Sequence, residues 1–209
     1  MARDTRKRIL VASLLLFNEQ GAPRTTINEI ADELDISPGN LNYHFRRKAD
    51  IVDALAAEFQ ADARSVLRPP DDEYPGLDDF WLFLHELLEL TGVYRFMLTD
   101  TEVLTDEYPA VGRALRHFAK ALQGSFELYL HGLEESGLIV CAPGELGNVA
   151  KVLAVIALLS GRFDTMTGEI KEADDAAIGV ARTILGVLKP LATEAAARQF
   201  EYLATHYSE

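Results

Sequence analysis

The stretch from Thr25 to Ile51 constrains the fold of this chain more than any other, because it carries the start signals of two short helices. Thr26 and Glu29 have the spacing of a capping box, in which the hydroxyl and the carboxylate each satisfy backbone N–H groups at a helix start. Apolar residues then follow at the spacing of one helix face, at Ile27, Ile30, Ala31 and Leu34. The stretch therefore predicts a first short helix that ends near residue 35.

A second short helix is expected directly after a brief turn. Ser37 suits the capping position, and Pro38 suits the first helical position, where its missing N–H costs nothing. Leu41 and Phe45 are four residues apart and are expected to face the first helix. The other residues of this helix are then expected to point outward, namely Gly39, Asn40, Asn42, Tyr43 and His44.

This outward face is small, amide-rich and aromatic, which suits a helix that lies in a DNA groove. Asparagine can pair with an adenine edge, tyrosine and histidine can donate to phosphate, and glycine lets the backbone approach closely. Arg46, Arg47 and Lys48 follow and can neutralise phosphates. Two short helices around a tight turn form the helix-turn-helix arrangement. The residues expected to contact DNA are Thr26, Ser37, Pro38, Gly39, Asn40, Asn42, Tyr43, His44, Arg46 and Lys48. The alternative is a plain helical hairpin inside an ordinary bundle.

The same residues resemble the tetracycline-repressor (TetR) family of bacterial transcriptional regulators. The resemblance covers about residues 5–55, and its matching positions are Thr26, Ile30-Ala31, Ile36-Ser37, Gly39, Leu41, His44-Phe45, Lys48 and Ile51. Two positions depart from the family pattern: Asp35 stands where the family often has glycine, and Asn42 where it often has tyrosine. The resemblance implies an N-terminal DNA-binding domain and a C-terminal domain that forms a homodimer and holds a small-molecule inducer.

The net charge of −13 argues at first against a DNA-binding protein, but its distribution removes the objection. Residues 1–50 carry eight Lys/Arg and seven Asp/Glu, whereas the remaining residues carry 12 and 26. An acidic second part should repel DNA and leave the N-terminal face to approach it. We therefore expect the bound partner to be double-stranded DNA, in the form of a near-palindromic operator.

The rest of the chain is predicted to be helical, so the fold class is all-α. No strand-like alternation persists, and helices are expected at about 4–20, 48–67, 77–96, 110–136, 145–168 and 173–207. Residues 97–107 suit a short helix or a loop, and Lys189-Pro190 should bend or interrupt the last helix. The proline- and acid-rich residues 68–76 form a polar break. We expect a DNA-binding domain at 1–60 and an effector-binding and dimerisation domain at 61–209.

Residues 149–163 are apolar around most of a helix, and such a helix must be covered on all sides. A partner subunit can provide that cover, so the last two long helices are the expected surface of a homodimer. The alternative is a central core helix in a monomer.

An effector site is expected among the helices spanning 77–136, where aromatic and apolar residues are dense. The expected lining is Phe80, Trp81, Leu84, His85, Tyr94, Phe96, Met97, His117, Phe118 and Phe126. The alternative is that these aromatic side chains only fill a core.

Other chemistry has little support in the sequence. His85 and Glu89 resemble part of a zinc-protease pattern, but the second histidine is missing. The only cysteine is Cys141, and no phosphate-binding loop or nucleophile motif is present. The apolar run from Val152 to Leu159 is too short to span a bilayer. We therefore expect a cytoplasmic repressor with no catalytic residues, no metal and no cofactor. The alternative is an all-α carrier of small molecules whose N-terminal hairpin is only structural.

Overall fold

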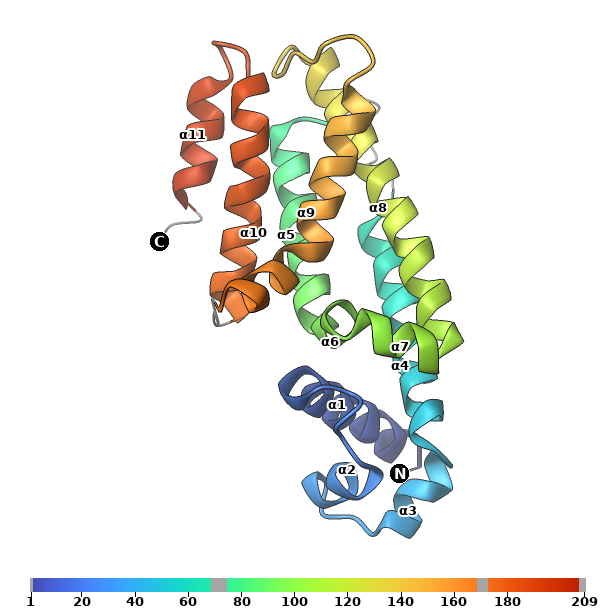
Figure 1. Cartoon of the computed structure of the whole chain (residues 1–209). Helices are drawn as coiled ribbons and strands as arrows, with labels where there is room; N and C mark the ends of the chain where they lie inside the picture. Colours follow the sequence, from blue (N-terminus) through green and yellow to red (C-terminus); the bar gives the residue numbers. More distant parts are fainter. Residues whose placement is uncertain (1, 69–74, 169–172, 207–209) are drawn as a thin grey trace. The chain divides into compact units, whose positions relative to one another are not determined.

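The computed structural model describes residues 2–68, 75–168 and 173–206, and almost all of them lie in helices (Figure 1). The first four are α1 (Ala2–Gln20), α2 (Ile27–Glu33), α3 (Pro38–His44) and α4 (Lys48–Val66). The others are α5 (Leu77–Val93), α6 (Arg95–Thr99), α7 (Thr101–Glu107), α8 (Pro109–Glu135), α9 (Leu146–Thr167), α10 (Ala173–Leu188) and α11 (Ala197–His206). The all-α prediction is confirmed.

The chain divides into two compact units. The first contains residues 1–63 and 93–117, and the second contains residues 64–92 and 118–209. Residues 93–117 therefore pack with the N-terminal helices, although the sequence suggested one continuous second domain after residue 60. Most of the predicted polar break at 68–76 lies outside the described residues.

Two predicted helices are interrupted. The helix expected at 77–96 ends at Val93, and α6 begins two residues later. The helix expected at 173–207 stops at Leu188, where a short 3-10 turn (Lys189–Leu191) follows as Pro190 requires. The backbone then pairs with residues 138–140, because Val140 N–H donates to Leu191 O at 2.8 Å and Thr193 N–H to Leu138 O at 2.9 Å.

The second unit has an aromatic core between α5 and α8. Phe83 and Tyr129 stack with their ring centroids 4.5 Å apart, and Phe126 meets Phe83 edge-on at 5.4 Å. Phe80 lies 6.0 Å from Tyr129 and is fully buried. Burial, together with the nearby Asp79 carboxylate, raises the pKa of Tyr129, so this ring stays neutral and packs as an apolar group. At least part of the aromatic density of 77–136 is therefore packed core.

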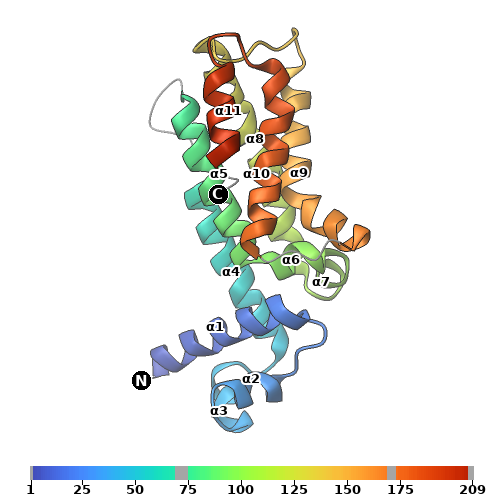
Figure 2. The same cartoon turned by 90° about the vertical axis from the view of Figure 1, so that its left-hand side faces the viewer.

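Helix α9 packs along α10, and the two lie side by side in Figures 1 and 2. One face of α9 is buried at Ala150, Leu153 and Ala154. Its opposite face carries an exposed apolar row, which we call the α9 stripe: Val152, Val155, Leu159, Phe163 and Met166. Leu146–Asp164 is long and apolar enough to cross a membrane, by length and composition only, and 22% of this stretch is buried in the single chain.

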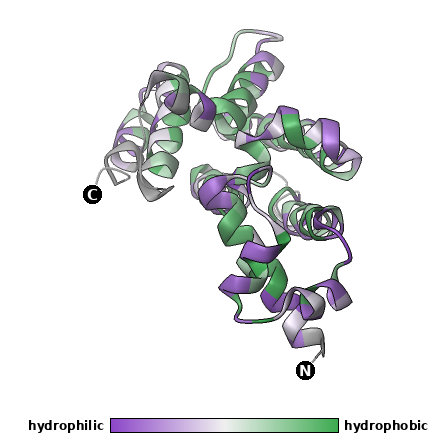
Figure 3. Cartoon of the chain, turned by 60° about the horizontal axis from the view of Figure 1, so that its bottom comes forward, coloured by the Kyte–Doolittle hydropathy of each residue, from purple (hydrophilic) through white to green (hydrophobic). Residues whose placement is uncertain are grey.

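A helix that packs on one side only has apolar residues on its buried face and polar residues on its exposed face. In Figure 3, hydrophilic and hydrophobic residues accordingly alternate along the ribbons of the helices.

Candidate nucleic-acid interface

Helix α2 begins with the capping box that the sequence predicts. Thr26 N–H donates to Glu29 Oε2 at 2.7 Å, and Glu29 N–H donates to Thr26 Oγ1 at 3.2 Å. The backbone hydrogen bond from Thr26 is the main cause that lowers the pKa of Glu29. The contribution of this carboxylate to stability is therefore present above its ordinary pKa and is lost as the pH falls through the lowered one.

The turn between α2 and α3 depends on Asp35, which has a left-handed backbone conformation with φ of 53°. Asp35 N–H donates to Asp32 O at 3.1 Å, and Ile36 N–H donates to Ala31 O at 3.0 Å. This pair of bonds is the Schellman motif that commonly ends a helix at a left-handed glycine. Asp35 thus occupies a left-handed position that favours glycine and that aspartate adopts more readily than most other residues.

Helix α3 presents the outward face that the sequence predicts. Ser37 Oγ accepts from Asn40 N–H at 3.2 Å and so caps the helix, while Leu41 and Phe45 are buried. Gly39, Asn40 and Asn42 are exposed, His44 is half-buried, and Tyr43 is 81% exposed. An exposed tyrosine, two exposed amides and no acidic residue therefore occur together on one short, capped helix, whose place in the fold is shown in Figure 1.

The basic residues beside α3 have different roles. Lys48 Nζ points inward and donates to Ala22 O at 2.8 Å and to Thr25 O at 3.2 Å. Arg47 pairs with Asp50 at 3.1 Å, and the Arg6 guanidinium lies over the Phe45 ring at 4.7 Å. Arg46 is exposed. The sequence predicts that Arg46, Arg47 and Lys48 neutralise phosphates, and these contacts stay predictions. In the free protein the ammonium of Lys48 holds the start of α4 against the loop that follows α1.

The residues predicted to bind an effector fall into both units. Tyr94, Phe96, Met97 and His117 belong to the first unit. The others belong to the second unit, namely Phe80, Trp81, Leu84, His85, Phe118 and Phe126. Most of them are buried, but His85 and His117 are exposed in the chain by itself. In the first unit, Phe96 packs on Phe17 with ring centroids 5.3 Å apart, so part of the predicted lining supports α1.

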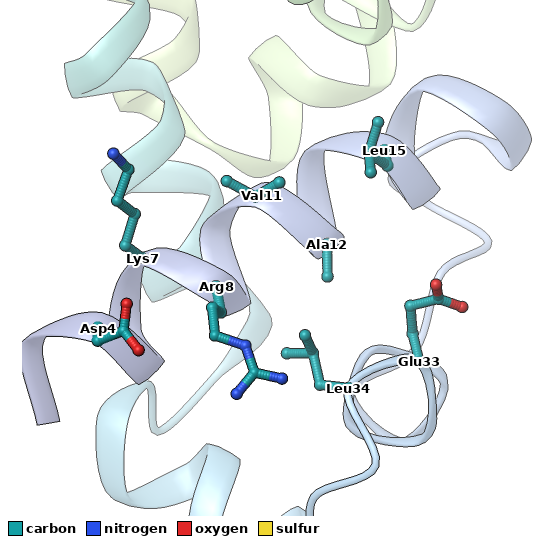
Figure 4. Close-up of a pocket in the computed structure, with 8 residues that line it drawn as sticks. All are labelled: Asp4, Lys7, Arg8, Val11, Ala12, Leu15, Glu33 and Leu34. Atoms are coloured by element: carbon teal, nitrogen blue, oxygen red, sulfur yellow. The ribbon is translucent and has the colours of Figure 1, made fainter. Parts of the chain in front are cut away.

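A hollow of about 520 Å³ lies on the side of the first unit, between α1 and the end of α2 (Figure 4). Its lining joins four charged residues to four apolar ones, namely Asp4, Lys7, Arg8, Glu33, Val11, Ala12, Leu15 and Leu34. Both signs of charge are present in equal number, so the lining indicates no single class of ligand.

Sequence reasoning missed two residues that shape this unit. Thr25 is buried and its hydroxyl donates to Gly21 O at 2.9 Å, which closes the turn before α2. Asn18 donates to Val93 O and accepts from Phe96 N–H, across more than 70 residues of sequence. The only sequence signal for Asn18 was its position, as a polar residue near the predicted end of a helix.

Comparisons with known proteins agree with this geometry. Residues 9–55 match the family model described as "Bacterial regulatory proteins, tetR family", and residues 58–200 match the one described as "Bacterial transcriptional repressor". Both departures from the family pattern, Asp35 and Asn42, lie within the first match.

The chain is 33% identical over 167 residues to the uncharacterized HTH-type transcriptional regulator YvkB of Bacillus subtilis, covering 77% of this chain and 82% of that protein. It is 30% identical to the probable regulator YttP of the same organism, but over only 28% of that protein's length. The crystal structure of a TetR-family regulator from Marinobacter aquaeolei VT8 superposes with a TM-score of 0.86 at 27% identity, covering 97% of this chain and 98% of that one.

These matches cover the helix-turn-helix and the helical remainder together. They exclude the alternatives of a plain helical hairpin and of a carrier with a purely structural N-terminus, and they identify a protein without enzymatic activity. The chain belongs to the TetR family of soluble, DNA-binding transcriptional regulators.

Proposed function

We propose that this protein is a homodimeric repressor that is released from its operator when an apolar or amphipathic small molecule binds. The single observation that carries the DNA half of this proposal is the outward face of α3, on which Tyr43 is 81% exposed. Residues 1–60 serve as the DNA-binding domain and residues 61–209 as the effector and dimer domain of a cytoplasmic protein.

In this proposal α3 enters the major groove. Asn40 and Asn42 read base edges, Tyr43 and His44 reach the phosphate backbone, and Gly39 allows close approach. Thr26, Ser37 and Pro38 lie at the starts of α2 and α3, where backbone N–H groups attract phosphate. Arg46 supplies direct charge, and Lys48 contributes through the start of α4.

The α9 stripe supports the homodimer. Its residues recur every three or four positions and stay exposed in the single chain, as expected of a helix that meets a second copy of itself. A two-fold axis would present two copies of α3 to half-sites about one helical turn apart, which requires a near-palindromic operator.

The effector is proposed to bind among the apolar residues of α5 and α8, which include Trp81, Leu84 and Phe118. A ligand can release DNA only through a difference in affinity between the two states of the protein. Its binding would move α5 and α8, and the change would pass along α4 to alter the separation of the two α3 helices.

A fluorescence-anisotropy titration tests the DNA half. A duplex selected by the wild-type protein from a random library is titrated with wild type and with Tyr43→Ala, and Tyr202→Ala of α11 serves as the matched tyrosine control. We expect sub-micromolar, salt-dependent binding by wild type and the control, and binding at least about tenfold weaker for Tyr43→Ala. Equal binding by all three proteins would contradict the proposed interface.

The effector half has a built-in probe, because Trp81 is the only tryptophan of the chain. A panel of apolar and amphipathic compounds is titrated against the protein–duplex complex while Trp81 emission and anisotropy are recorded together. We expect compounds that release the duplex to change Trp81 emission at the same concentration. Release without any change in Trp81 emission would place the effector elsewhere.

A further inference from the structure

The end of α1 and the break between α5 and α6 cap each other. The α1 helix ends with Gly21 in a left-handed conformation, φ 88°, whose N–H donates to Phe17 O at 3.0 Å. This ending leaves the carbonyl of Asn18 without a partner within its own helix. The Arg95 guanidinium satisfies it with two hydrogen bonds, from Nε at 3.1 Å and from one terminal nitrogen at 3.0 Å.

The Asn18 side chain in turn caps the break between α5 and α6. The residue before α6 is Tyr94, whose own side chain makes no capping hydrogen bond. Asn18 Oδ1 instead accepts from Phe96 N–H at 3.0 Å, at the second position of α6, as a capping side chain would. Asn18 Nδ2 donates to Val93 O, the last carbonyl of α5, at 2.8 Å. One amide thus caps the end of α5 and the start of α6.

The other end of α6 also lies close to the end of α1. Asp100 Oδ2 is buried without a hydrogen-bond partner among the described residues and lies 3.0 Å from the position that a Cβ on Gly21 would occupy. The Phe17 and Phe96 rings pack against each other with their centroids 5.3 Å apart. Helix α6 therefore contacts α1 through the Phe96 ring, and the residue that follows α6 lies beside Gly21.

Tyr94, the residue between α5 and α6, connects this break to α4. Tyr94 Oη donates to Asp62 Oδ2 at 2.6 Å, and the Tyr94 ring meets Phe59 edge-on at 5.3 Å. Successive residues of the break thus contact α4 through Tyr94 and α1 through Arg95 and Phe96. Helix α5, which runs directly into this break, supplies much of the proposed effector lining.

We propose that Asn18 and Arg95 are positioning residues whose mutual capping makes the α5–α6 break and the N-terminal DNA-binding helices change conformation together. The inference rests on the proposed function, because it assigns the route by which the state of α5 reaches α1 and α4. By reciprocity, DNA bound to α3 must then alter the stability of residues 93–100.

Hydrogen exchange measured by mass spectrometry on the full-length protein tests this coupling. Peptides covering 93–100 are followed with and without a saturating amount of the duplex that the wild type selects. We expect DNA to slow exchange at 93–100 in wild type. In Asn18→Ala, exchange of the free protein should be about fivefold faster there, as for a lost helix cap, and the DNA-dependent slowing should disappear. The affinity of this variant for the duplex should stay within about threefold of wild type, because Asn18 is outside the proposed DNA contacts.

Three comparisons separate coupling from a merely structural role. Glu19→Ala, at the exposed neighbouring position, should behave as wild type. Asn18→Asp keeps the acceptor for Phe96 N–H but loses the donor to Val93 O. This variant tests the proposal if Asn18→Ala does not fold. Its DNA-dependent slowing of exchange at 93–100 should also be lost. Arg95→Lys keeps a donor and should restore part of the slowing that Arg95→Ala loses.

The outcomes that overturn the proposal differ from those that overturn the function. If wild type binds the duplex but shows no slowing at 93–100, or if Asn18→Ala keeps the full slowing, the coupling role is wrong while the regulator remains. If wild type selects no duplex at all, the proposed DNA-binding function fails and the coupling role falls with it.

Discussion

The N-terminal helices and the C-terminal helices of this protein are held together in different ways. Helices α2 and α3 have only seven residues each, and each depends on hydrogen bonds that span three to five residues: the Thr26–Glu29 capping box, the Asp35 turn and the Ser37 cap. Helices α8 and α9 have 27 and 22 residues and depend on packing against other helices, since Tyr129 of α8 stacks on Phe83 of α5 and α9 packs along α10. Local capping fixes the shape of the first region, and packing fixes the second.

This difference indicates where each region is vulnerable. Short helices are marginal alone, so the loss of one cap or one tie changes the geometry of the DNA-binding face. Long packed helices tolerate such losses, but they are sensitive to changes in volume and to charge placed on a surface that must be covered.

The largest effect is expected at the α9 stripe. Phe163→Asp places a charge on a residue that is 65% exposed in the single chain but covered in the proposed homodimer. We expect a monomer in sedimentation experiments and operator affinity reduced by about 100-fold or more, because the two half-sites are no longer linked. Leu82→Asp, at an exposed leucine of α5, is the control and should remain dimeric. A dimeric Phe163→Asp protein would contradict the proposed interface.

The next effect distinguishes a local tie from a DNA contact. Lys48→Met removes the ammonium that donates to Ala22 O and Thr25 O, and we expect a loss of about 1.5–3 kcal/mol in the free energy of unfolding of the N-terminal helices. Its slope of log affinity against log salt should match wild type. Arg46→Met should instead leave stability unchanged and reduce that slope by about 0.9, the value for one phosphate contact. A reduced slope for Lys48→Met would show that its charge reaches DNA.

These two residues also show how far the sequence could predict the site. The capping box, the Ser37 cap and the outward face of α3 are written within a few adjacent residues, so pattern reasoning placed them correctly. The direction of Lys48 depends on carbonyls 23 to 26 residues earlier, and the break at Tyr94 depends on Asn18. No periodicity in one segment contains that information.

The same limit applies to the second unit. The density of aromatic residues between 77 and 136 was evident from the sequence, but density alone does not separate a core from a ligand site. The stacking of Phe83 on Tyr129 depends on how α5 packs against α8, which the apolar spacing within either helix does not specify. Helix positions were predictable from apolar spacing, whereas side-chain partners were not.

A smaller effect is expected where two segments of the second unit meet closely. A Cβ on Gly132 would lie 2.5 Å from Pro75 Cδ and 2.7 Å from Pro75 O, so the backbone must shift to admit it. We expect Gly132→Ala to lower the free energy of unfolding by about 1–3 kcal/mol in denaturant titrations, as for an overpacked core. Gly124→Ala, in the same helix with no atom within 4 Å, should be neutral or stabilising by up to about 1 kcal/mol. Equal effects of the two changes would mean that the close approach does not hold in solution.

The smallest effect is expected at the Asp35 turn, and its sign is the informative part. With φ at 53°, Asp35 carries a left-handed conformation that costs a residue with a side chain about 1–2 kcal/mol, less for aspartate than for most. Asp35→Gly removes this cost but adds backbone entropy to the unfolded chain, so we expect a net gain of no more than about 1 kcal/mol. Asp35→Val should lose stability instead, because a β-branched residue fits this conformation poorly. Thermal unfolding of wild type, Asp35→Gly and Asp35→Val measures the order of their stabilities. If glycine is less stable than aspartate, the Asp35 side chain contributes more to this turn than its backbone conformation costs.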